Sequence, residues 1–270
     1  MDVGNMVVFC DEMSINTGCQ FPIMAIFAAA LVPSCEFSVA AQDTVDFRYS
    51  PPEWQTAICL PDDPQKSLVD KSGELLYHYK GGPGREFGTR IAVEVVSIAV
   101  WQTQTLYSPR VPIVQTHRAA DGWQIVEEAF AVTDQNVGAE ARPSLAEPAG
   151  PPCNDVILVR VTNTGAVART LSPRLIVDTT RDYRRLGETG VVVNAHETIS
   201  ASLKMTGPVE ENKSRRAIQL ESLAVAPGKS VQFFVLYSGG GSIVLSPTTV
   251  EQAVADREHA VAFWEKAPLP

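Results

Sequence analysis

Short runs in which apolar and polar residues alternate recur along most of this chain. The stretch 89–108, TRIAVEVVSIAVWQTQTLYS, is dense in β-branched residues and alternates Ala92 and Glu94 with Val93 and Val95. Such runs, bounded by Gly, Pro and Asn, are typical of strands in a half-buried antiparallel sheet. The same pattern predicts strands within 123–133, 155–165, 172–180, 189–195, 216–226 and 229–238.

Turn residues fall between these predicted strands. The segments TNTGA (162–166) and APGKS (226–230) supply the Asn, Gly and Pro that tight connections require. A parallel sheet would need helical crossovers, and no such pattern lies between the strands. We therefore expect a mainly β fold, a large antiparallel β-sandwich of the supersandwich kind, with the proline-rich segment 140–154 as a loop inside it.

A single helix is predicted near the C-terminus, in SPTTVEQAVADREHAVAFWEK (246–266). Thr248 or Thr249 is the candidate N-cap, because threonine oxygens accept the free N–H groups of the first turn. The proline-containing segment APLP (267–270) follows. Four apolar residues fall near one face at helical spacing: Val250, Val254, Val261 and Trp264.

The N-terminal 41 residues form an apolar leader. FPIMAIFAAALVPSC (21–35) has the length of a signal-peptide core, and small residues offer cleavage after Ala40 or Ala41. The first residues lack the usual positive charge, so a buried core helix is the alternative. A lipoprotein anchor at Cys35 is less favoured, since Pro33 fits a lipobox poorly. We expect an exported protein, periplasmic or extracellular, without a membrane segment once the leader is removed.

The predicted organisation is thus a leader at 1–41, a β-sandwich at 42–245 and a helical connector at 246–270.

The charge of the chain argues against nucleic acid as a partner. The formal net charge is −9, and no block of Lys and Arg is present. Beyond the leader only Cys59 and Cys153 remain, either as a disulfide or as two buried thiols. No CxxC motif or paired histidines indicate a metal site.

No catalytic signature or cofactor motif stands out. The chain has no GxSxG elbow, HExxH motif, phosphate loop or SxxK motif, so we assign no catalytic residue and expect no cofactor. The adjacent acids Glu127 and Glu128 would point to opposite faces of a strand, which argues against an acid pair. Candidates for stacking on a sugar are Trp54, Trp101 and Tyr107, with burial in the core as the alternative.

Four segments carry a resemblance to a known family: EWQTAICLPDDPQKSLVDKSGELLYHY, LYSPRVPIVQTH, VRVTNTGAVARTLSPRLIV and AVADREHAVAFWEKAPLP. Over roughly 43–270 the chain resembles the N-terminal β-sandwich region of bacterial six-hairpin, (α/α)6-barrel glycosidase-like proteins. In that family the sandwich precedes the barrel, and the catalytic carboxylates lie mostly in the barrel. No barrel sequence is present here, so the resemblance implies no catalytic residue in this chain.

The resemblance leads to one expected function and two rivals. The first expectation is a secreted accessory domain, a fragment that is non-catalytic alone and partners a C-terminal (α/α)6 barrel in a glycoside hydrolase-like parent. A free-standing carbohydrate- or surface-binding module is the alternative. A complete enzyme with two carboxylates in a sandwich groove is the third possibility, and it requires two acids with perturbed pKa values in one concave site.

Overall fold

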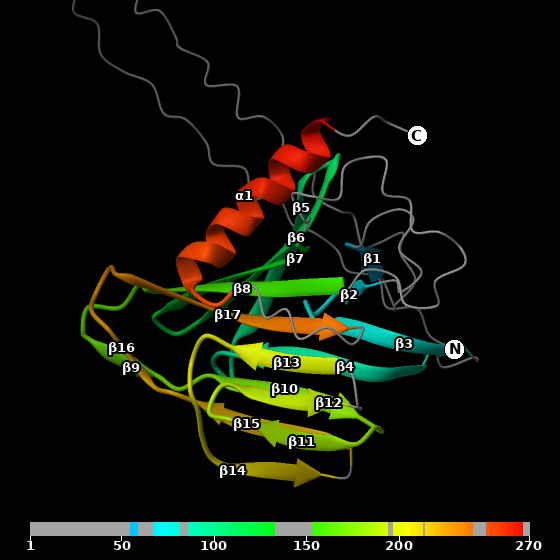
Figure 1. Cartoon of the computed structure of the whole chain (residues 1–270). Helices are drawn as coiled ribbons and strands as arrows, with labels where there is room; N and C mark the ends of the chain where they lie inside the picture. The colour runs from blue at the N-terminus through cyan, green and yellow to red at the C-terminus, as the bar shows by residue number, and fades with distance from the viewer. Residues whose placement is uncertain are drawn as a thin grey trace, which may run out of the picture. The chain divides into compact units, whose positions relative to one another are not determined.

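The computed structural model describes residues 55–58, 67–81, 86–132, 153–193, 197–212, 214–239 and 247–266. Over these residues the fold is a mainly β structure built from large antiparallel sheets, with a helix at the C-terminal end (Figure 1). The predicted fold class is therefore confirmed.

The first layer is a seven-stranded sheet in which neighbouring strands run antiparallel. In sheet order its strands are β1 (Gln55–Ala57), β2 (Leu68–Asp70), β3 (Leu75–Gly81), β4 (Glu86–Glu94), β10 (Arg174–Thr179), β15 (Arg215–Leu220) and β14 (Met205–Asn212).

The second layer is an eight-stranded antiparallel sheet. Two further strands form a separate two-stranded antiparallel ribbon. The sheet contains, in order, β11 (Tyr183–Leu186), β12 (Gly190–Val193), β13 (Glu197–Ala201), β17 (Ser230–Gly239), β8 (Cys153–Asn163), β7 (Trp123–Ala131), β6 (Val111–Ala120) and β5 (Val100–Ser108). The ribbon pairs β16 (Leu223–Val225) with β9 (Arg169–Leu171).

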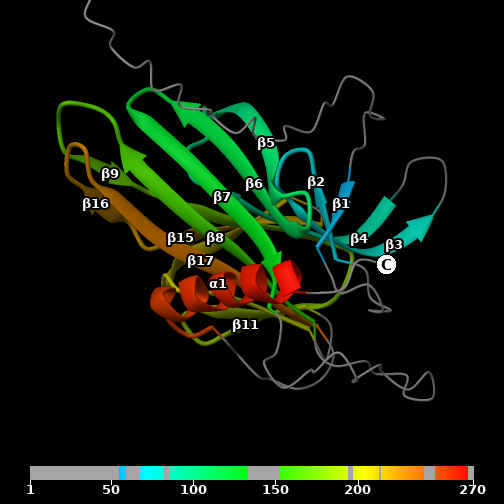
Figure 2. The ribbon, with the colours of Figure 1, turned by 90° about the horizontal axis from the view of Figure 1, so that it is seen from above.

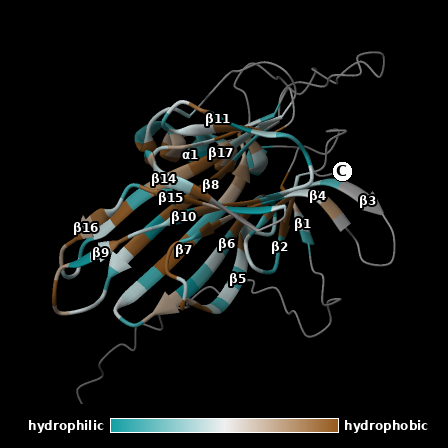
Figure 3. Cartoon of the chain, turned by 90° about the horizontal axis from the view of Figure 1, so that it is seen from below, coloured by the Kyte–Doolittle hydropathy of each residue, from teal (hydrophilic) through white to brown (hydrophobic). Residues whose placement is uncertain are grey.

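The main core lies between the two large sheets. Alternate residues of each strand face it, as the banding of hydrophobic and hydrophilic positions along β5, β6 and β7 illustrates (Figure 3). Its fully buried members come from both layers and include Leu75, Ile91, Leu175, Ile218, Ile125, Ile157, Val191 and Phe233.

A second core covers the outer face of the eight-stranded sheet, beneath helix α1 (Val250–Lys266), which contacts β6, β7, β8 and β17 (Figure 2). Residues 156–159 of β8 and 233–237 of β17 are therefore buried on both faces, and these parts of the two strands read as continuous apolar runs. Val156 and Leu158 of β8 face the helix, whereas Ile157 and Val159 face the main core.

The helix begins as the sequence predicts. Thr249 is the N-cap: its Oγ1 accepts a hydrogen bond from the Gln252 N–H at 3.2 Å. The Gln252 side chain in turn accepts a hydrogen bond from the Thr248 N–H at 3.0 Å. Two backbone N–H groups at the start of the helix are thus satisfied by side chains. The four predicted apolar residues do pack on the sheet: Val250, Val254, Val261 and Trp264.

Two predicted elements differ in detail from the structure. The stretch 89–108 forms two strands, β4 and β5, which belong to different sheets. A turn separates them, closed by a hydrogen bond from the Ala99 N–H to the Val96 carbonyl at 3.0 Å. The turn itself is apolar, with Ile98 69% exposed, and it contains no Gly, Pro or Asn that would reveal the break. Likewise 216–226 divides into β15 and β16.

Candidate functional site

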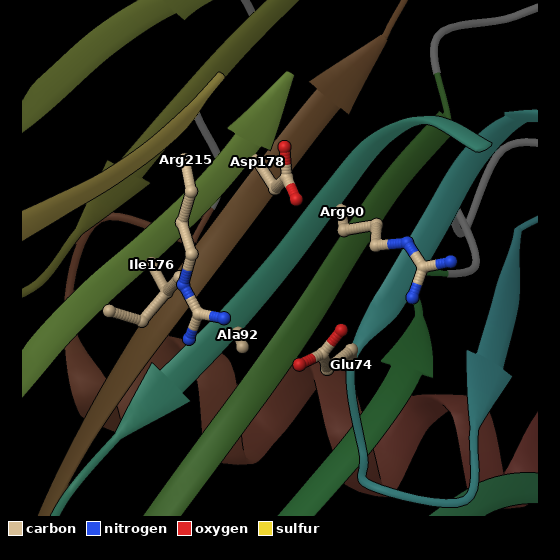
Figure 4. Close-up of a pocket in the computed structure, with 6 residues that line it drawn as sticks. All are labelled: Glu74, Arg90, Ala92, Ile176, Asp178 and Arg215. Atoms are coloured by element: carbon tan, nitrogen blue, oxygen red, sulfur yellow. The ribbon is translucent and has the colours of Figure 1, made fainter. Parts of the chain in front are cut away.

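The outer face of the seven-stranded sheet carries a hollow of about 160 Å³ (Figure 4). Because Ile91, Leu175 and Ile218 face the core, strand alternation turns their neighbours outward. The lining residues are Glu74 from the β2–β3 turn, Arg90 and Ala92 from β4, Ile176 and Asp178 from β10, and Arg215 from β15.

Sheet register brings three of the charged side chains together. Asp178 is the Cα partner of Arg90 on one side and of Arg215 on the other, so the three lie in a row across neighbouring strands about 4.8 Å apart. Figure 4 shows both guanidinium groups extending away from Asp178, toward the side on which Glu74 lies. The result is a ring of alternating positive and negative groups.

The β2–β3 turn holds Glu74 in place. Asp70 Oδ1 accepts hydrogen bonds from the N–H groups of Ser72 and Glu74, at 2.8 and 2.9 Å, and from the Ser72 hydroxyl at 2.7 Å. Burial raises the pKa of the Glu74 carboxyl, and the nearby Asp70 raises it further, while Arg90 and Arg215 act in the opposite direction.

The floor of the hollow is small and apolar. Ala92 is half-buried and lies between the charged groups, whereas Ile176 is only 5% exposed and lies on the side of Arg215 away from Arg90 (Figure 4). Chemically, the hollow presents guanidinium hydrogen-bond donors and carboxylate acceptors around an apolar patch. No sequence motif links the polar residues of the hollow.

The same turn also covers a buried acid on the facing sheet. Glu127, 3% exposed, lies 3.4 Å from Arg118, whose guanidinium also donates to the Ser72 carbonyl. Burial raises the pKa of Glu127 to about 7. Its neighbour Glu128 instead pairs with Arg257 of α1 at 2.9 Å. The two acids thus lie on opposite faces of β7, as strand geometry predicts.

A further polar cluster joins the two sheets. His78 of β3 adopts a positive φ of 58°, and its Nε2 lies 3.0 Å from the buried Glu197 of β13, which also pairs with Arg181 at 3.2 Å. Beside it, the Tyr77 hydroxyl donates to the buried Asp155 at 2.8 Å. Residues this far apart in the chain carry no sequence signal that would reveal the cluster.

Two of the three aromatic candidates, Trp101 and Tyr107, lie on β5. Trp101 is half-buried, with the Lys71 ammonium 5.2 Å from its ring centroid. Tyr107 is 39% exposed and lies under Arg257 of α1, 4.9 Å away. Trp54, the third candidate, lies outside the described residues.

Several other predictions also concern parts of the chain outside the described residues. These are the leader with Cys35, Ala40 and Ala41, and the side chains of Cys59 and Cys153.

In the part of the chain that the structure describes, no helix is long and apolar enough to span a membrane. No group of three or more His, Cys, Asp or Glu side chains there could hold a metal ion.

Comparisons with known proteins add a structural likeness. No protein-family model and no curated protein matches the chain. Among solved structures, 31 chains match it. One is a protein assigned as a kojibiose phosphorylase from the human microbiome, with a TM-score of 0.35 and 9% sequence identity. The match covers 76% of this chain and 28% of the neighbour, so most of that protein has no counterpart here.

Proposed function

We propose that this chain is the β-sandwich accessory domain of a carbohydrate-active protein. In this role the domain is exported, is non-catalytic by itself, and braces an (α/α)6-barrel domain of the same parent protein. The observation that carries the proposal is the docking of α1 on the eight-stranded sheet.

Two kinds of contact hold the helix there. Ala253, Ala260 and Val261 are buried against the sheet, and Arg257 pairs with Glu128. The Arg257 and Glu128 side chains are only 14% and 13% exposed, so solvent screens their attraction weakly. A helix fixed in this way holds a neighbouring domain in one orientation, which a flexible linker does not.

The exposed residues of α1 would contact such a domain. They are Glu251, Ala255, Glu258, Glu265 and Lys266, and Glu258 also pairs with Arg257. We expect the partner surface to be basic where it meets these acids, because opposite charges steer and orient association.

A second candidate function is a free-standing carbohydrate-binding module. The charged hollow on the seven-stranded sheet favours it, since this site lies on the face of the sandwich that α1 does not cover.

Sequencing the gene beyond the codon for Pro270 tests the first proposal. We expect the reading frame to continue into several hundred residues with the pattern of paired helices. A stop codon directly after Pro270 would reject the accessory role and leave the binding module.

The non-catalytic role needs a separate assay. The purified 270-residue chain, incubated with a panel of disaccharides with and without phosphate, is expected to release no monosaccharide or sugar phosphate. Turnover by this chain alone would overturn that role.

Export is tested at the N-terminus of the protein produced in a bacterial host. Cleavage after Ala40 or Ala41 in the periplasmic fraction is the expected result, detected by N-terminal sequencing. An uncleaved, cytoplasmic product would contradict it.

A further inference from the structure

We propose that the hollow lined by Glu74, Arg90, Ala92, Ile176, Asp178 and Arg215 binds an uncharged polyhydroxyl ligand, a single sugar ring. This proposal rests on the carbohydrate-binding function proposed above. It places the sugar site at the hollow and not at the aromatic candidates.

Within the part of the chain that the structure describes, three charged groups of the hollow form no ion pair. Glu74, Asp178 and Arg215 take part in none of the ion pairs found among the described residues, although register places Asp178 between two arginines. Neighbouring opposite charges on a sheet ordinarily pair. Here the guanidinium groups extend past Asp178 and leave donors and acceptors facing the hollow (Figure 4).

The alternation of charge selects against ionic ligands. An anion that approaches Arg90 or Arg215 also meets the carboxylates of Glu74 and Asp178, which repel it. A zwitterion needs its positive and negative partners separated, whereas here the carboxylate of Asp178 is flanked by arginines on both sides.

Neutral hydroxyl groups are not repelled by the carboxylates and do not need separated positive and negative partners. Each hydroxyl donates one hydrogen bond and accepts others, so adjacent hydroxyls of a sugar can accept from a guanidinium and donate to a carboxylate. The apolar C–H face of the ring would lie on Ala92 and Ile176. These two side chains are smaller than the aromatic rings that stack on sugars elsewhere, which predicts a weak, millimolar site.

The size of the hollow limits the ligand. Its volume of about 160 Å³ is below the roughly 300–1,000 Å³ of pockets for drug-sized ligands. One ring fits inside, and further rings of an oligosaccharide would extend into solvent.

The test is a titration of the isotopically labelled full chain with methyl glycosides of glucose, galactose and mannose. We expect saturable shifts of the Ala92 and Ile176 amide signals for at least one glycoside, unchanged between low and high salt. Arg215→Gln and Asp178→Asn should each weaken binding about 10-fold or more, since each loses hydrogen bonds to a charged group.

Arg160→Gln is the matched control, because this exposed arginine lies on β8 of the other sheet. It should leave the affinity unchanged. Shifts that persist in both hollow variants, or no saturable shift with any glycoside, would overturn the proposal. Tighter binding of inorganic phosphate or glycine than of the glycosides would replace the sugar with an anion or a zwitterion.

This outcome is separable from that of the accessory role. A chain that binds no glycoside can still brace a barrel, and the gene sequence decides that question. A chain that binds glycosides but ends at Pro270 keeps the sugar site and loses the barrel partner.

Discussion

Glu127 shows how strongly the fold changes the chemistry of one residue. Burial raises its pKa from 4.5 to about 7; Glu74 and Asp70 add to the rise and Arg118 opposes it. Between these two pH values the folded protein retains a proton that the unfolded chain has lost. The contribution of Glu127 to the free energy of unfolding is therefore greatest below pH 4.5. It falls by about 3 kcal/mol as the pH rises to 7.

We therefore expect Glu127→Gln to flatten the decline of stability with pH, because glutamine cannot ionise. Urea unfolding at about pH 5 and about pH 8 measures this as a smaller difference between the two free energies than in the wild type. Gln124→Ala, an exposed position on the same strand, serves as the control. An unchanged pH difference in Glu127→Gln would show that Glu127 is not the responsible group.

Gly73 is the residue of the β2–β3 turn at which a side chain would be both strained and crowded. Its φ is 86°, and a Cβ placed there would lie 3.0 Å from both Glu127 Oε2 and Thr116 Oγ1. The turn can approach the buried acid this closely only because glycine has no side chain.

The prediction is that Gly73→Ala costs clearly more stability than Gly228→Ala. Gly228 also has a positive φ, 66°, but a Cβ there meets no atom within 4 Å. Gly228→Ala should cost about 1–2 kcal/mol for the backbone alone, and Gly73→Ala at least about 1 kcal/mol more because of crowding. Thermal unfolding compares the two, and equal losses would contradict the close approach.

At the scale of elements, α1 depends on the sheet beneath it. Ala253 and Ala260 are fully buried, and their small size lets the helix lie close to β8 and β17. Since helices of this length are only marginally stable in isolation, tertiary packing supplies most of the stability of α1.

A larger side chain at a buried alanine of α1 should weaken the packing of the helix on the sheet. We expect Ala253→Leu to destabilise the docked helix by about 1–3 kcal/mol, whereas Ala255→Leu, on the exposed side, should have little effect. Hydrogen exchange of the α1 amides measures both. If Ala253→Leu left the protection of the helix intact, α1 would not be held by this close packing.

At the scale of the whole sandwich, one core and a set of polar contacts join the two sheets. Tyr77 of the seven-stranded sheet stacks on Tyr237 of the other, with ring centroids 3.7 Å apart, and donates to the fully buried Asp155. Because both layers share these groups, neither sheet can separate without exposing the apolar core and a buried carboxylate.

Tyr77→Phe removes the hydroxyl and retains the stacked ring. We expect a loss of about 0.5–3 kcal/mol, the range for a lost hydrogen bond to a neutral or charged group, in a single transition of both sheets. Coincident unfolding curves from circular dichroism and tryptophan fluorescence would establish this cooperativity. Two separated transitions would show that the sheets unfold independently.

The sequence by itself determined the class of the fold and its local features. Alternation and β-branched content predicted strands, and helical spacing with a threonine cap predicted α1. Asn163 and Gly228 marked real turns: Gly165 N–H donates to Asn163 Oδ1, and Gly228 N–H to the Asn163 carbonyl. These features depend on residues close in sequence, so local patterns suffice to predict them.

Only the tertiary structure decided which sheet each strand joins and which side chains meet. The break between β4 and β5 is invisible in sequence because the turn between them is apolar and contains no Gly, Pro or Asn. The row of Arg90, Asp178 and Arg215 depends on the register of three strands, two of which lie more than 80 residues along the chain from the first. Local patterns specify that a residue faces outward, but long-range pairing alone specifies its neighbour across the sheet.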